Sequence, residues 1–419
     1  MPSLEAVLDN LYARTSRNIT LGLERMEQAC TELLHPEHQF PVIHVAGTNG
    51  KGSVCAMVES IARIKGLTTG LYTSPHLCHF NERIRIQGEP IDSLDLADVL
   101  DIALSLKIPL SFFECATLAA FLAFQRASVD IAILEVGLGG RLDATNVIPP
   151  PLACAITRIA YDHTALLGST LSQIAREKAG IAKKGSPLVL GSLVSEAKDS
   201  IEQYAHAVGA TVMHAEEDEK AARFIESHPS TGLPGRYQLE NAKIAYVLGS
   251  IIGATPQERA KGIASAQWPA RLETVQISGH SYLFDAAHNP DGARVLAEEL
   301  QHLSPSFPTM ILLFGALADK NWREMLDTLA PLFQHRIYVE PPLRTKEGEF
   351  HRAPAPAEIL SRAYPGQCAN SIPKALELIL TFSSSSQHTP LIVVCGSIYL
   401  VGYVRALLLN LDCDPLIPL

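Results

Sequence analysis

Short apolar runs alternate along the chain with segments that have the polar and apolar spacing of helices. Strands are predicted at the apolar runs, which fall at 41–47, 130–137, 152–157, 187–191, 282–287, 309–316, 336–340 and 390–397. These runs are almost continuously apolar, which is typical of parallel strands that helices cover on both faces. The order of strands and helices predicts an α/β fold along the whole chain.

A change of pattern at 267–270 predicts a domain boundary. The sequence Gln-Trp-Pro-Ala interrupts a helical region there, before the second series of strands begins. At 419 residues the chain is also too long for one ordinary hydrophobic core. We therefore expect two domains, 1–267 and 268–419, with insertions in the first because it is large for a single α/β unit.

The composition indicates a folded chain and excludes some classes of partner. Hydrophobic residues make up 47% and charged residues 19%, which excludes a largely disordered or coiled-coil chain. The net charge of −10 argues against general nucleic-acid binding, because such binding needs cations that neutralise phosphates. A few local cations can still hold a small anion. Eight cysteines without a Cys-x-x-Cys pair are typical of free thiols in a reducing compartment.

We expect neither a targeting segment nor a membrane-spanning segment in this chain. Its first residues include Glu5 and Asp9 and lack the apolar core of a signal peptide. The longest apolar run, at 391–404, is shorter than the roughly 20 residues that a transmembrane helix needs. We expect a soluble, cytoplasmic monomer that binds small molecules and neither nucleic acid nor membranes.

A glycine-rich segment between a predicted strand and a predicted helix carries the strongest local signal. Glycines let backbone N–H groups curl around a polyphosphate, the helix N-terminus favours negative charge, and a lysine adds a positive charge. The spacing departs from the common phosphate loop, because Val45 stands at the first glycine position and Gly52 separates Lys51 from Ser53. Glycine-rich turns also occur in ordinary loops, but the strand–loop–helix context favours nucleotide binding by Thr48, Asn49, Gly50, Lys51, Gly52 and Ser53.

Nine segments spread over nearly the whole chain match the motifs of one protein family in the same order. Together they identify a family far more specifically than any single segment does. They read HVAGTNGKGSV, YTSPHLCHFNERI, LEVGLGGRLDATN, ITRIAYDHTALLG, REKAGI, LPGRYQLENAKIA, WPARLE, DAAHNPDGA and CGSIYLVG. With these segments the chain resembles the folylpolyglutamate synthase/dihydrofolate synthase branch of the Mur ligase superfamily, which shares the unusual phosphate loop. The resemblance implies a Mur-ligase-like P-loop ATPase domain with a pterin or folate pocket, and a second, smaller Rossmann-like α/β domain on the glutamate and ATP side.

Ser74, Glu135 and His163 each lie at or just past the end of a strand-like run, where doubly wound sheets place their ligands. Taken singly, Ser74 could be a turn residue, His163 a capping or core residue, and Glu135 a buried ion-pair partner. A glutamate in an apolar run is costly to bury unpaired, which favours a functional role. The resemblance implies two magnesium ions, one on Ser74 and Glu135 and the other on His163 together with Glu135.

Lys178 has two interpretations. A lysine in a helix is usually exposed to solvent, and the residue pattern alone favours this interpretation. The resemblance implies instead that Lys178, in the segment REKAGI, is carbamylated. A desolvated lysine near other cations loses its proton readily and can then capture carbon dioxide as an anionic carbamate. The resemblance thus assigns catalytic roles to Lys51, Lys178 and His163.

The nucleotide site is expected to draw on both domains. Gln238 and Asn241 lie three apart in a predicted helix, where surface polarity is the simplest interpretation. The resemblance places Asn241 against the adenine and implies that Arg271 and Asp285 complete the ATP site. A guanidinium can contact phosphate, and a carboxylate can accept hydrogen bonds from ribose hydroxyls. His288 also matches the family, without an assigned role.

By the same resemblance, the segments 19–26, 111–118 and 141–144 line the pocket for a pterin or folate. A flat aromatic ring needs apolar walls and a few polar partners, although Phe112 and Phe113 can equally be core residues. Thr20 stands where some relatives have an aspartate, which leaves the acceptor preference open. The implied substrate site comprises Thr20, Leu21, Gly22, Leu23, Phe112, Phe113, Glu114, Cys115, Leu142, Asp143 and Ala144.

The reaction implied by the resemblance is ATP-dependent amide formation. An acceptor carboxylate attacks the γ-phosphate, and the amine of L-glutamate displaces phosphate from the acyl phosphate. The acceptors would be 7,8-dihydropteroate, giving dihydrofolate, and tetrahydrofolate, which further glutamates would extend. Three alternatives stay open: a monofunctional folylpolyglutamate synthase, a Mur-type cell-wall peptide ligase and a non-catalytic nucleotide-binding module. The segments TSPHLCHFNERI and GLGGRLDATN favour the folate branch over the cell-wall ligases.

Overall fold

The structure is a computed structural model that describes residues 2–14, 22–228, 230–343, 353–385 and 389–414. The chain folds into two compact units, one within 1–76 and 80–268 and the other within 77–79 and 269–419. The division follows Trp268, one residue beyond the boundary expected from the sequence. Each unit is described by itself.

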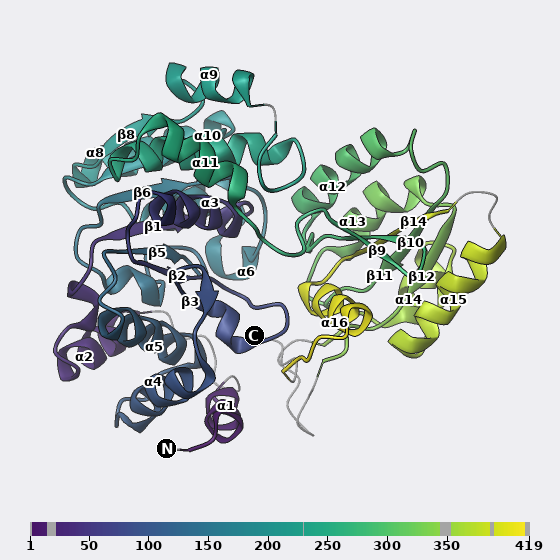
Figure 1. The fold of residues 1–419 in the computed structure, drawn as a ribbon, viewed down its shortest axis with the longest axis horizontal. Helices are drawn as coiled ribbons and strands as arrows, with labels where there is room; N and C mark the ends of the chain where they lie inside the picture. Colours follow the sequence, from purple (N-terminus) through teal and green to yellow (C-terminus); the bar gives the residue numbers. More distant parts are fainter. Residues whose placement is uncertain (1, 15–21, 229, 344–352, 386–388, 415–419) are drawn as a thin grey trace. The chain divides into compact units, whose positions relative to one another are not determined.

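The first unit is built on a mixed sheet (Figure 1). Its strands are β1 (Val42–Ala46), β2 (Thr69–Tyr72), β3 (Ile84–Ile86), β4 (Glu89–Pro90), β5 (Ile131–Glu135), β6 (Ala153–Ile156), β7 (Pro187–Leu190) and β8 (Thr211–His214). Among the described residues the sheet has eight strands in the order β4-β3-β2-β5-β1-β6-β7-β8. All neighbours run parallel except β3, which is antiparallel to β2 and β4. The four apolar runs in this part of the chain are confirmed as β1, β5, β6 and β7.

Helices lie on both sides of this sheet. The described helices of the unit are α1 (Leu4–Tyr12), α2 (Glu24–Glu32), α3 (Lys51–Ile64), α4 (Ser93–Ser105), α5 (Phe112–Arg126), α6 (Thr164–Leu167), α7 (Leu171–Ala179), α8 (Ser195–Val208), α9 (Glu219–Ser227), α10 (Tyr237–Ile251) and α11 (Pro256–Ser265). Short 3-10 turns are η1 (Pro36–His38), η2 (Phe80–Arg83) and η3 (Ala144–Val147).

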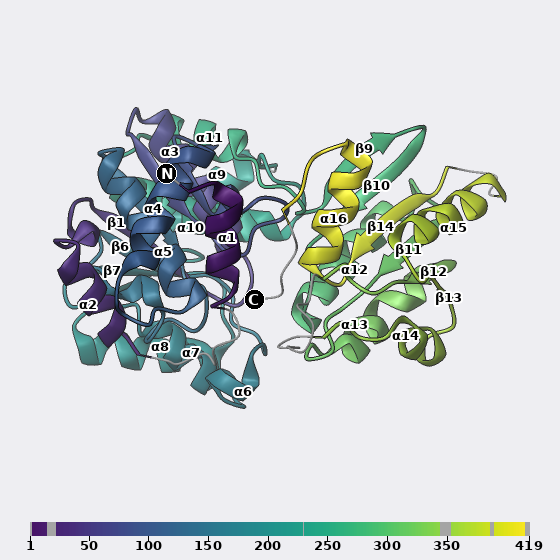
Figure 2. The same cartoon turned by 90° about the horizontal axis from the view of Figure 1, so that it is seen from below.

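Strand β6 shows why the central runs are apolar throughout. Its residues Ala153 and Ala155 belong to a core that β1 and β5 share with α3, α10 and α11. Cys154 and Ile156 of the same strand belong to a second core with α7 and α8, which lie on the opposite side of β6 and β7 (Figure 2). Successive side chains of a strand point to opposite faces, so a strand covered on both faces favours apolar residues at successive positions.

The register of the central strands brings the candidate site residues to one edge. Val45 of β1 pairs with Glu135 of β5 on one side and with Ala155 of β6 on the other. These strands are parallel, so the segments that follow them all leave the sheet at its carboxyl edge. This edge is where open α/β sheets bind their ligands.

The second unit has a smaller sheet of the same class. Its strands are β9 (Glu273–Ile277), β10 (His280–Phe284), β11 (Met310–Phe314), β12 (His335–Tyr338), β13 (Gln367–Cys368) and β14 (Leu391–Cys395). Among the described residues the order is β13-β12-β11-β14-β10-β9, and only β9 runs antiparallel to its neighbour. The helices are α12 (Pro290–Leu303), α13 (Trp322–Leu329), α14 (Ala357–Ala363), α15 (Ile372–Ser385) and α16 (Ile398–Leu409), with the turn η4 (Ala330–Leu332).

Helices also cover both faces of the second sheet. The apolar residues of α15 and α16 share a core with β10, β11, β12 and β14. Helices α12 and α13 lie on the other side of these strands (Figure 2). The four later apolar runs are therefore confirmed as strands, and the α/β class expected from the pattern is confirmed, with mixed instead of purely parallel sheets.

A three-residue segment from early in the chain belongs to the second unit. The thiol of Cys78 lies 3.6 Å from the carbonyl oxygen of Gly402, and Nδ1 of His79 lies 3.1 Å from Oδ1 of Asp414. A Cβ at position 402 would lie 2.3 Å from the carbonyl oxygen of Leu77, so α16 needs glycine there. The sequence pattern did not predict that residues 77–79 belong to the second unit.

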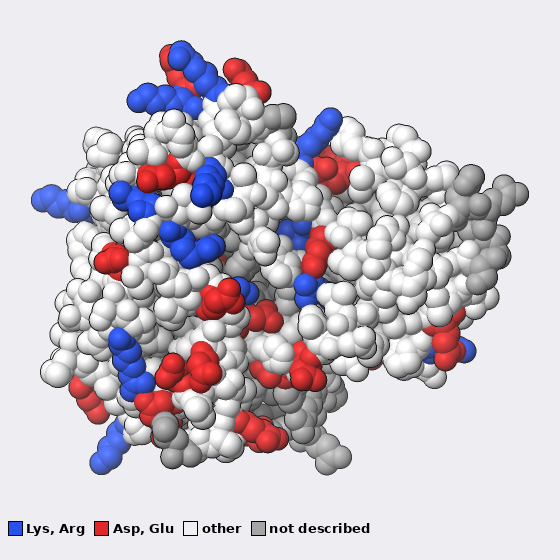
Figure 3. All heavy atoms as spheres, in the orientation of Figure 1, with Lys and Arg blue, Asp and Glu red and all other residues white. Residues whose placement is uncertain are grey.

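The surface carries charges of both signs. On the face in Figure 3, acidic and basic side chains of the described residues are intermixed within each unit, without a continuous basic surface. Among the described helices, none combines the length and apolar character that crossing a bilayer requires.

Candidate active site

The glycine-rich loop connects β1 to α3, as the sequence predicted. Gly47 and Gly50 adopt φ values of 151° and 91°, in the region that favours glycine. A Cβ on Gly47 would lie 1.9 Å from Oγ1 of Thr157, and one on Gly50 would lie 2.6 Å from Oδ1 of Asn241. The loop therefore needs glycine for both its conformation and its close packing.

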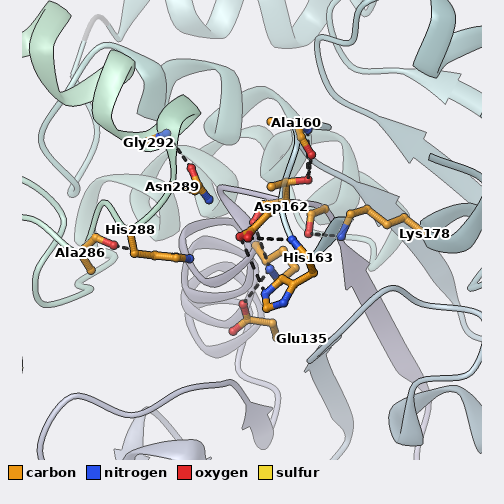
Figure 4. Close-up of polar contacts among 12 residues, drawn as sticks. Glu135, Ala160, Asp162, His163, Lys178, Ala286, His288, Asn289 and Gly292 are labelled. Atoms are coloured by element: carbon orange, nitrogen blue, oxygen red, sulfur yellow. Dashed lines mark hydrogen bonds and ion pairs between the residues drawn. The ribbon is translucent and has the colours of Figure 1, made fainter. Parts of the chain in front are cut away.

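Hydrogen bonds tie this loop to the segment that follows β6. The amide of Thr48 donates to the carbonyl oxygen of Arg158 at 2.6 Å, and its hydroxyl donates to that of Ala160 at 3.1 Å (Figure 4). Oγ1 of Thr157 donates to the carbonyl oxygen of Asn49 at 2.7 Å. The N-cap of α3 is Gly50, which has no side chain to accept from the first-turn amides. A fixed loop leading into such a helix start is the arrangement that binds phosphate.

Lys51, Glu135 and Ser74 come together at the start of α3. Nζ of Lys51 donates to the carbonyl oxygen of Thr48 at 3.3 Å and lies 3.8 Å from Oε1 of Glu135. Oε2 of Glu135 accepts from the amide of Ser74 at 3.2 Å, and the Glu135 side chain is buried. A buried carboxylate next to a hydroxyl residue supplies the hard oxygen ligands that magnesium prefers, so these two residues fit the expected ion.

His163 lies on the turn between β6 and α6. It adopts the left-handed conformation, with φ of 49°, and its amide donates to Oδ1 of Asp162 at 2.9 Å. Its side chain is 35% exposed, so it is not a core residue; it stands at the N-cap position of α6, but its side chain forms no cap hydrogen bond. Figure 4 shows His163 and Asp162 in one group with Glu135 and Lys178.

Lys178 is buried, so the expectation from the residue pattern alone, an exposed helix lysine, is wrong. Its Nζ donates to the carbonyl oxygen of Gly47 at 3.0 Å. Burial, and next the charge of Lys51, lowers the pKa of Lys178 to about 7, while Asp162 and Asp143 oppose this change. A large fraction of this amine is therefore uncharged near neutral pH.

Polar residues of α10 pack on the same loop. Nε2 of Gln238 donates to Oγ of Ser53 at 3.2 Å, and Nδ2 of Asn241 donates to Oε1 of Gln238 at 2.8 Å. Both residues are buried, so surface polarity is the wrong interpretation. On the other side of the helix start, a Cβ on Gly52 would lie 2.9 Å from Nε1 of Trp268. A larger residue at position 52 would therefore overlap the Trp268 ring.

The candidate acceptor residues of α5 lie beside β2. Phe112 is buried and stacks on Tyr12, with ring centroids 5.6 Å apart. Phe113 is only partly buried, and its ring centroid lies 6.0 Å from that of Tyr72. A Cβ on Gly137 would lie 2.3 Å from the Phe113 ring, so glycine makes room for it. Phe112 is thus mainly a packing residue, whereas Phe113 is the better candidate for contact with a ligand.

Asp143 is held by a network of hydrogen bonds. Its carboxylate accepts from the amides of Leu138 and Thr145, at 2.8 and 3.0 Å, and from the hydroxyl of Thr145 at 2.5 Å. Nε2 of the buried His44 lies 2.8 Å from the same hydroxyl. Burial raises the pKa of Asp143, and these hydrogen bonds oppose the rise. Ala144 is buried beside it, and Leu142 is partly buried.

Other expected acceptor residues have structural partners. Oε2 of Glu114 accepts from the amide of Ser111 at 2.7 Å in a capping box, and Oε1 lies 2.9 Å from Nη2 of Arg25. Cys115 is buried. Gly22 and Leu23 precede α2 and are partly buried, whereas Thr20 and Leu21 lie outside the described residues. Substrate contact by this group stays a prediction.

In the second unit, Asp285 directly follows β10 and is buried. Its carboxylate accepts from the amides of Leu272 and Ala287, at 3.0 and 2.9 Å. Burial raises the pKa of Asp285, and the nearby Arg271 opposes the rise. Arg271 itself donates to the carbonyl oxygen of Ala270 at 3.0 Å. Asp285 therefore fixes the turn that carries Arg271.

His288 lies in the turn that leads into α12. Its Nδ1 lies 2.9 Å from the carbonyl oxygen of Ala286, and the next residue, Asn289, accepts from the amide of Gly292 as the N-cap of α12 (Figure 4). These contacts orient His288 without assigning it a role.

Comparison with known proteins decides the family. Residues 45–249 match the Mur ligase middle domain, and residues 270–398 match the Mur ligase glutamate ligase domain. The chain is 34% identical to folylpolyglutamate synthase of Lacticaseibacillus casei over 413 residues, which covers 90% of this chain and 93% of the relative. It is 33% identical to dihydrofolate synthase/folylpolyglutamate synthase of Escherichia coli, covering 95% of this chain and 93% of the relative. The chain belongs to the folylpolyglutamate synthase/dihydrofolate synthase family of Mur ligases.

Solved structures of this family share the fold of the chain. One is FolC of E. coli in complex with DHPP and ADP, with a TM-score of 0.84 and 30% identity, covering 98% of this chain and 99% of that one. Another is a bifunctional folylpolyglutamate synthase/dihydrofolate synthase with Mn, AMPPNP and L-glutamate bound, with a TM-score of 0.82 and 31% identity, covering 97% and 98%. The resemblance seen in the sequence is thus confirmed over nearly the whole chain.

The sequence did not predict several residues that support the candidate site and the turns near it. Thr157 and Trp268 pack against loop glycines, and His44 supports the network around Asp143. Glu273 accepts from the amide of Ala270 at 2.8 Å, and Arg405 donates to both oxygens of Glu273 at 2.8 to 3.0 Å. The signal for Thr157 and His44 was available, because a polar residue within a buried apolar run needs a partner.

Proposed function

We propose that the chain is an ATP-dependent ligase that adds L-glutamate to dihydropteroate, forming dihydrofolate, and to tetrahydrofolate, extending its glutamate chain. The single observation that carries the proposal is the grouping of Lys51, Glu135 and Ser74 at the start of a helix that a glycine loop precedes. The family membership supports the ligase class, and the AMPPNP, Mn and L-glutamate bound by one relative support the substrates.

ATP would bind with its phosphates at the start of α3. The first-turn amides of α3 and the charge of Lys51 would hold the phosphates while the acceptor carboxylate attacks the γ-phosphate. The resulting acyl phosphate then reacts with the amine of L-glutamate, which forms the amide bond and releases phosphate. Most of the rate gain expected from this site comes from positioning and charge neutralisation.

Ser74 and Glu135 would hold one magnesium ion, and His163 with Glu135 a second. Bound magnesium would neutralise charge on the phosphates. Oxygen ligands suit magnesium, and the Mn in the related structure supports a divalent ion at such a site. The remaining expected ATP contacts, namely Thr48, Asn49, Gly52, Asn241, Arg271 and Asp285, are part of this proposal.

Lys178 would act in this site as a carbamate. Its uncharged amine would attack carbon dioxide, form a C–N bond and lose one proton, which gives a stable anion. Its burial and its pKa of about 7 support this, because a charged ammonium cannot react. The measurement is the intact mass of fresh enzyme prepared with bicarbonate. An unmodified mass, together with full activity in carbon-dioxide-free buffer, would exclude the carbamate.

The acceptor specificity rests on Phe113 and Asp143. A partly buried aromatic ring and a carboxylate fixed by hydrogen bonds suit a flat pterin with hydrogen-bond donors. The DHPP bound to E. coli FolC supports the folate branch and makes a cell-wall peptide acceptor the weaker alternative. A monofunctional folylpolyglutamate synthase remains the competing possibility, since one relative carries only that name.

The test is phosphate release with ATP, L-glutamate and each acceptor in turn. Release that needs both glutamate and either dihydropteroate or tetrahydrofolate would support the bifunctional enzyme. Release with tetrahydrofolate only would show a monofunctional enzyme. Glu135→Ala is the matched control, because it removes the carboxylate and leaves the glycine loop in place.

We further propose a cytoplasmic monomer whose partners are small molecules. All eight cysteines are free, which suits a reducing compartment. The intermixed surface charges give no extended basic surface on the described face, which argues against nucleic acid as a partner.

A further inference from the structure

Three residues of metal-binding type meet in the turn before β1, outside the candidate active site. His35, Glu37 and His38 belong to the sequence His-Pro-Glu-His, and one ligand atom from each lies within 4.8 Å of the others. Nδ1 of His35 lies 2.9 Å from Oε1 of Glu37, and Nε2 of His38 lies 3.3 Å from the same oxygen. The proposed function uses none of these residues.

The burial of Glu37 is the feature that needs an explanation. Its side chain is only 3% exposed, whereas those of His35 and His38 are 44% and 49% exposed. Oε2 of Glu37 is buried and has no hydrogen-bond partner among the described residues. A buried carboxylate is costly unless a cation compensates it.

The inner side of Glu37 offers no such cation. The thiol of Cys30 lies next to this carboxylate, and a thiol carries no positive charge. Compensation has to come from the side of the two imidazoles, which faces solvent.

The backbone fixes the turn that carries the two imidazoles. Leu34 and His35 both have positive φ, 61° and 56°, and the amide of His35 donates to the carbonyl oxygen of Cys30 at 2.7 Å. Non-glycine residues in this region cost roughly 1 to 3 kcal/mol each. The rings of His35 and His38 stack with centroids 4.7 Å apart and an interplanar angle of 14°, and one nitrogen of each ring lies near Oε1 of Glu37. An imidazole binds a metal in the plane of its ring, so one of these exposed rings has to turn for both to bind the same ion.

The ligand types and distances select the class of ion. Zinc takes imidazole nitrogen and carboxylate oxygen at about 2.0 to 2.2 Å, which places tetrahedral ligand atoms roughly 3.3 Å apart. The two contacts to Glu37, at 2.9 and 3.3 Å, are close to this spacing. Magnesium and calcium prefer oxygen ligands, so a site with two imidazoles favours zinc over them.

We propose that His35, Glu37 and His38 bind one zinc ion, with solvent as the fourth ligand. The turn η1 leads into the amino end of β1, whereas the phosphate loop follows its carboxyl end. The length of β1 separates the two sites by roughly 16 Å at about 3.3 Å per residue. The ion would therefore lie outside the candidate active site, at the connection between α2 and β1.

The test is titration of the metal-free full chain with zinc by calorimetry, in excess magnesium and ADP to occupy the candidate active site. One zinc ion per wild-type chain is expected, and the double variant His35→Ala/His38→Ala should lose it. Loss of even an outer partner costs 10- to 100-fold in affinity, so loss of two ligands should exceed about 100-fold. His206→Ala is the matched control, because His206 is an exposed histidine on a different element, α8.

Two further measurements keep the proposal testable if the double variant folds poorly. Glu37→Gln preserves the shape of the side chain and should weaken zinc binding by at least about 10-fold. Cobalt in place of zinc should give the visible absorption of a tetrahedral site without a thiolate charge-transfer band. Equal zinc binding by wild type and both variants, a thiolate band, or no zinc binding by wild type would each overturn the proposal.

Discussion

Replacing Lys178 by methionine should stabilise the first unit while it abolishes activity. The pKa of Lys178 falls from 10.5 to about 7 on folding, mainly because of burial. A difference of about 3.5 pH units corresponds to about 5 kcal/mol of lost stability when the amine must be charged. Methionine has a similar length and removes this cost, but it loses the hydrogen bond to Gly47, worth about 1 kcal/mol.

The sign and size of the effect depend on pH. The folded-state pKa lies below the unfolded one, so the unfolded chain binds the extra proton between about pH 7 and pH 10.5, and stability rises with pH in this window. The full loss of stability caused by the lowered pKa of Lys178 is present below pH 7. Lys178→Met should therefore be more stable than wild type by up to roughly 4 kcal/mol near pH 6, and by only about 1 kcal/mol near pH 9.

The assay is urea unfolding in carbon-dioxide-free buffer, followed by tryptophan fluorescence. The chain has two tryptophans, so the background Trp322→Phe leaves Trp268 as a reporter for the first unit. Lys220→Met, at an exposed position of α9, is the control. Its difference from wild type in free energy of unfolding should not depend on pH. A Lys178→Met variant that is destabilised by the same amount at every pH would refute the reasoning.

Three further predictions address the loop, the metal ligand and the second unit. Gly47→Ala should destabilise the first unit by roughly 1 to 3 kcal/mol and weaken ATP binding measured by calorimetry, because its Cβ would overlap Thr157; unchanged ATP affinity would contradict this. Glu135→Ala should abolish phosphate release while circular dichroism stays native, and retained turnover would contradict the metal assignment. Arg405→Ala should lower the free energy of unfolding of the second unit by about 1.5 to 3 kcal/mol, since it breaks the bidentate pair with Glu273; the measurement is urea unfolding followed by Trp322 fluorescence. Arg405→Lys should recover part of this loss, and a null effect of both variants would show that the pair is not stabilising.

The sequence was most informative where one physical rule governs a segment. Apolar runs predicted β1, β5 and β14, because a strand covered on both faces is mostly apolar, and the one polar residue at the centre of β1, His44, has a partner in Thr145. The glycine loop was predictable for the same kind of reason, since Gly47 and Gly50 have conformations and close contacts that other residues cannot adopt.

The sequence was least informative where burial depends on distant partners. Lys178 reads as a surface residue, because nothing near it in the sequence shows that its Nζ meets the carbonyl of Gly47. Strand β2 contains Gly70, and only the ring of Phe124 packed against it explains a glycine inside a strand. The placement of 77–79 in the second unit depends on contacts with Gly402 and Asp414, more than 300 residues away in the sequence.

The acyl phosphate is the central claim, and an isotope experiment tests it most directly. Dihydropteroate carrying heavy oxygen in its carboxylate is incubated with ATP, magnesium and L-glutamate, and the released phosphate is analysed by mass spectrometry. The proposed reaction transfers one heavy oxygen to each phosphate for every dihydrofolate formed. Dihydrofolate formed together with unlabelled phosphate, or ATP hydrolysis without dihydrofolate, would contradict it.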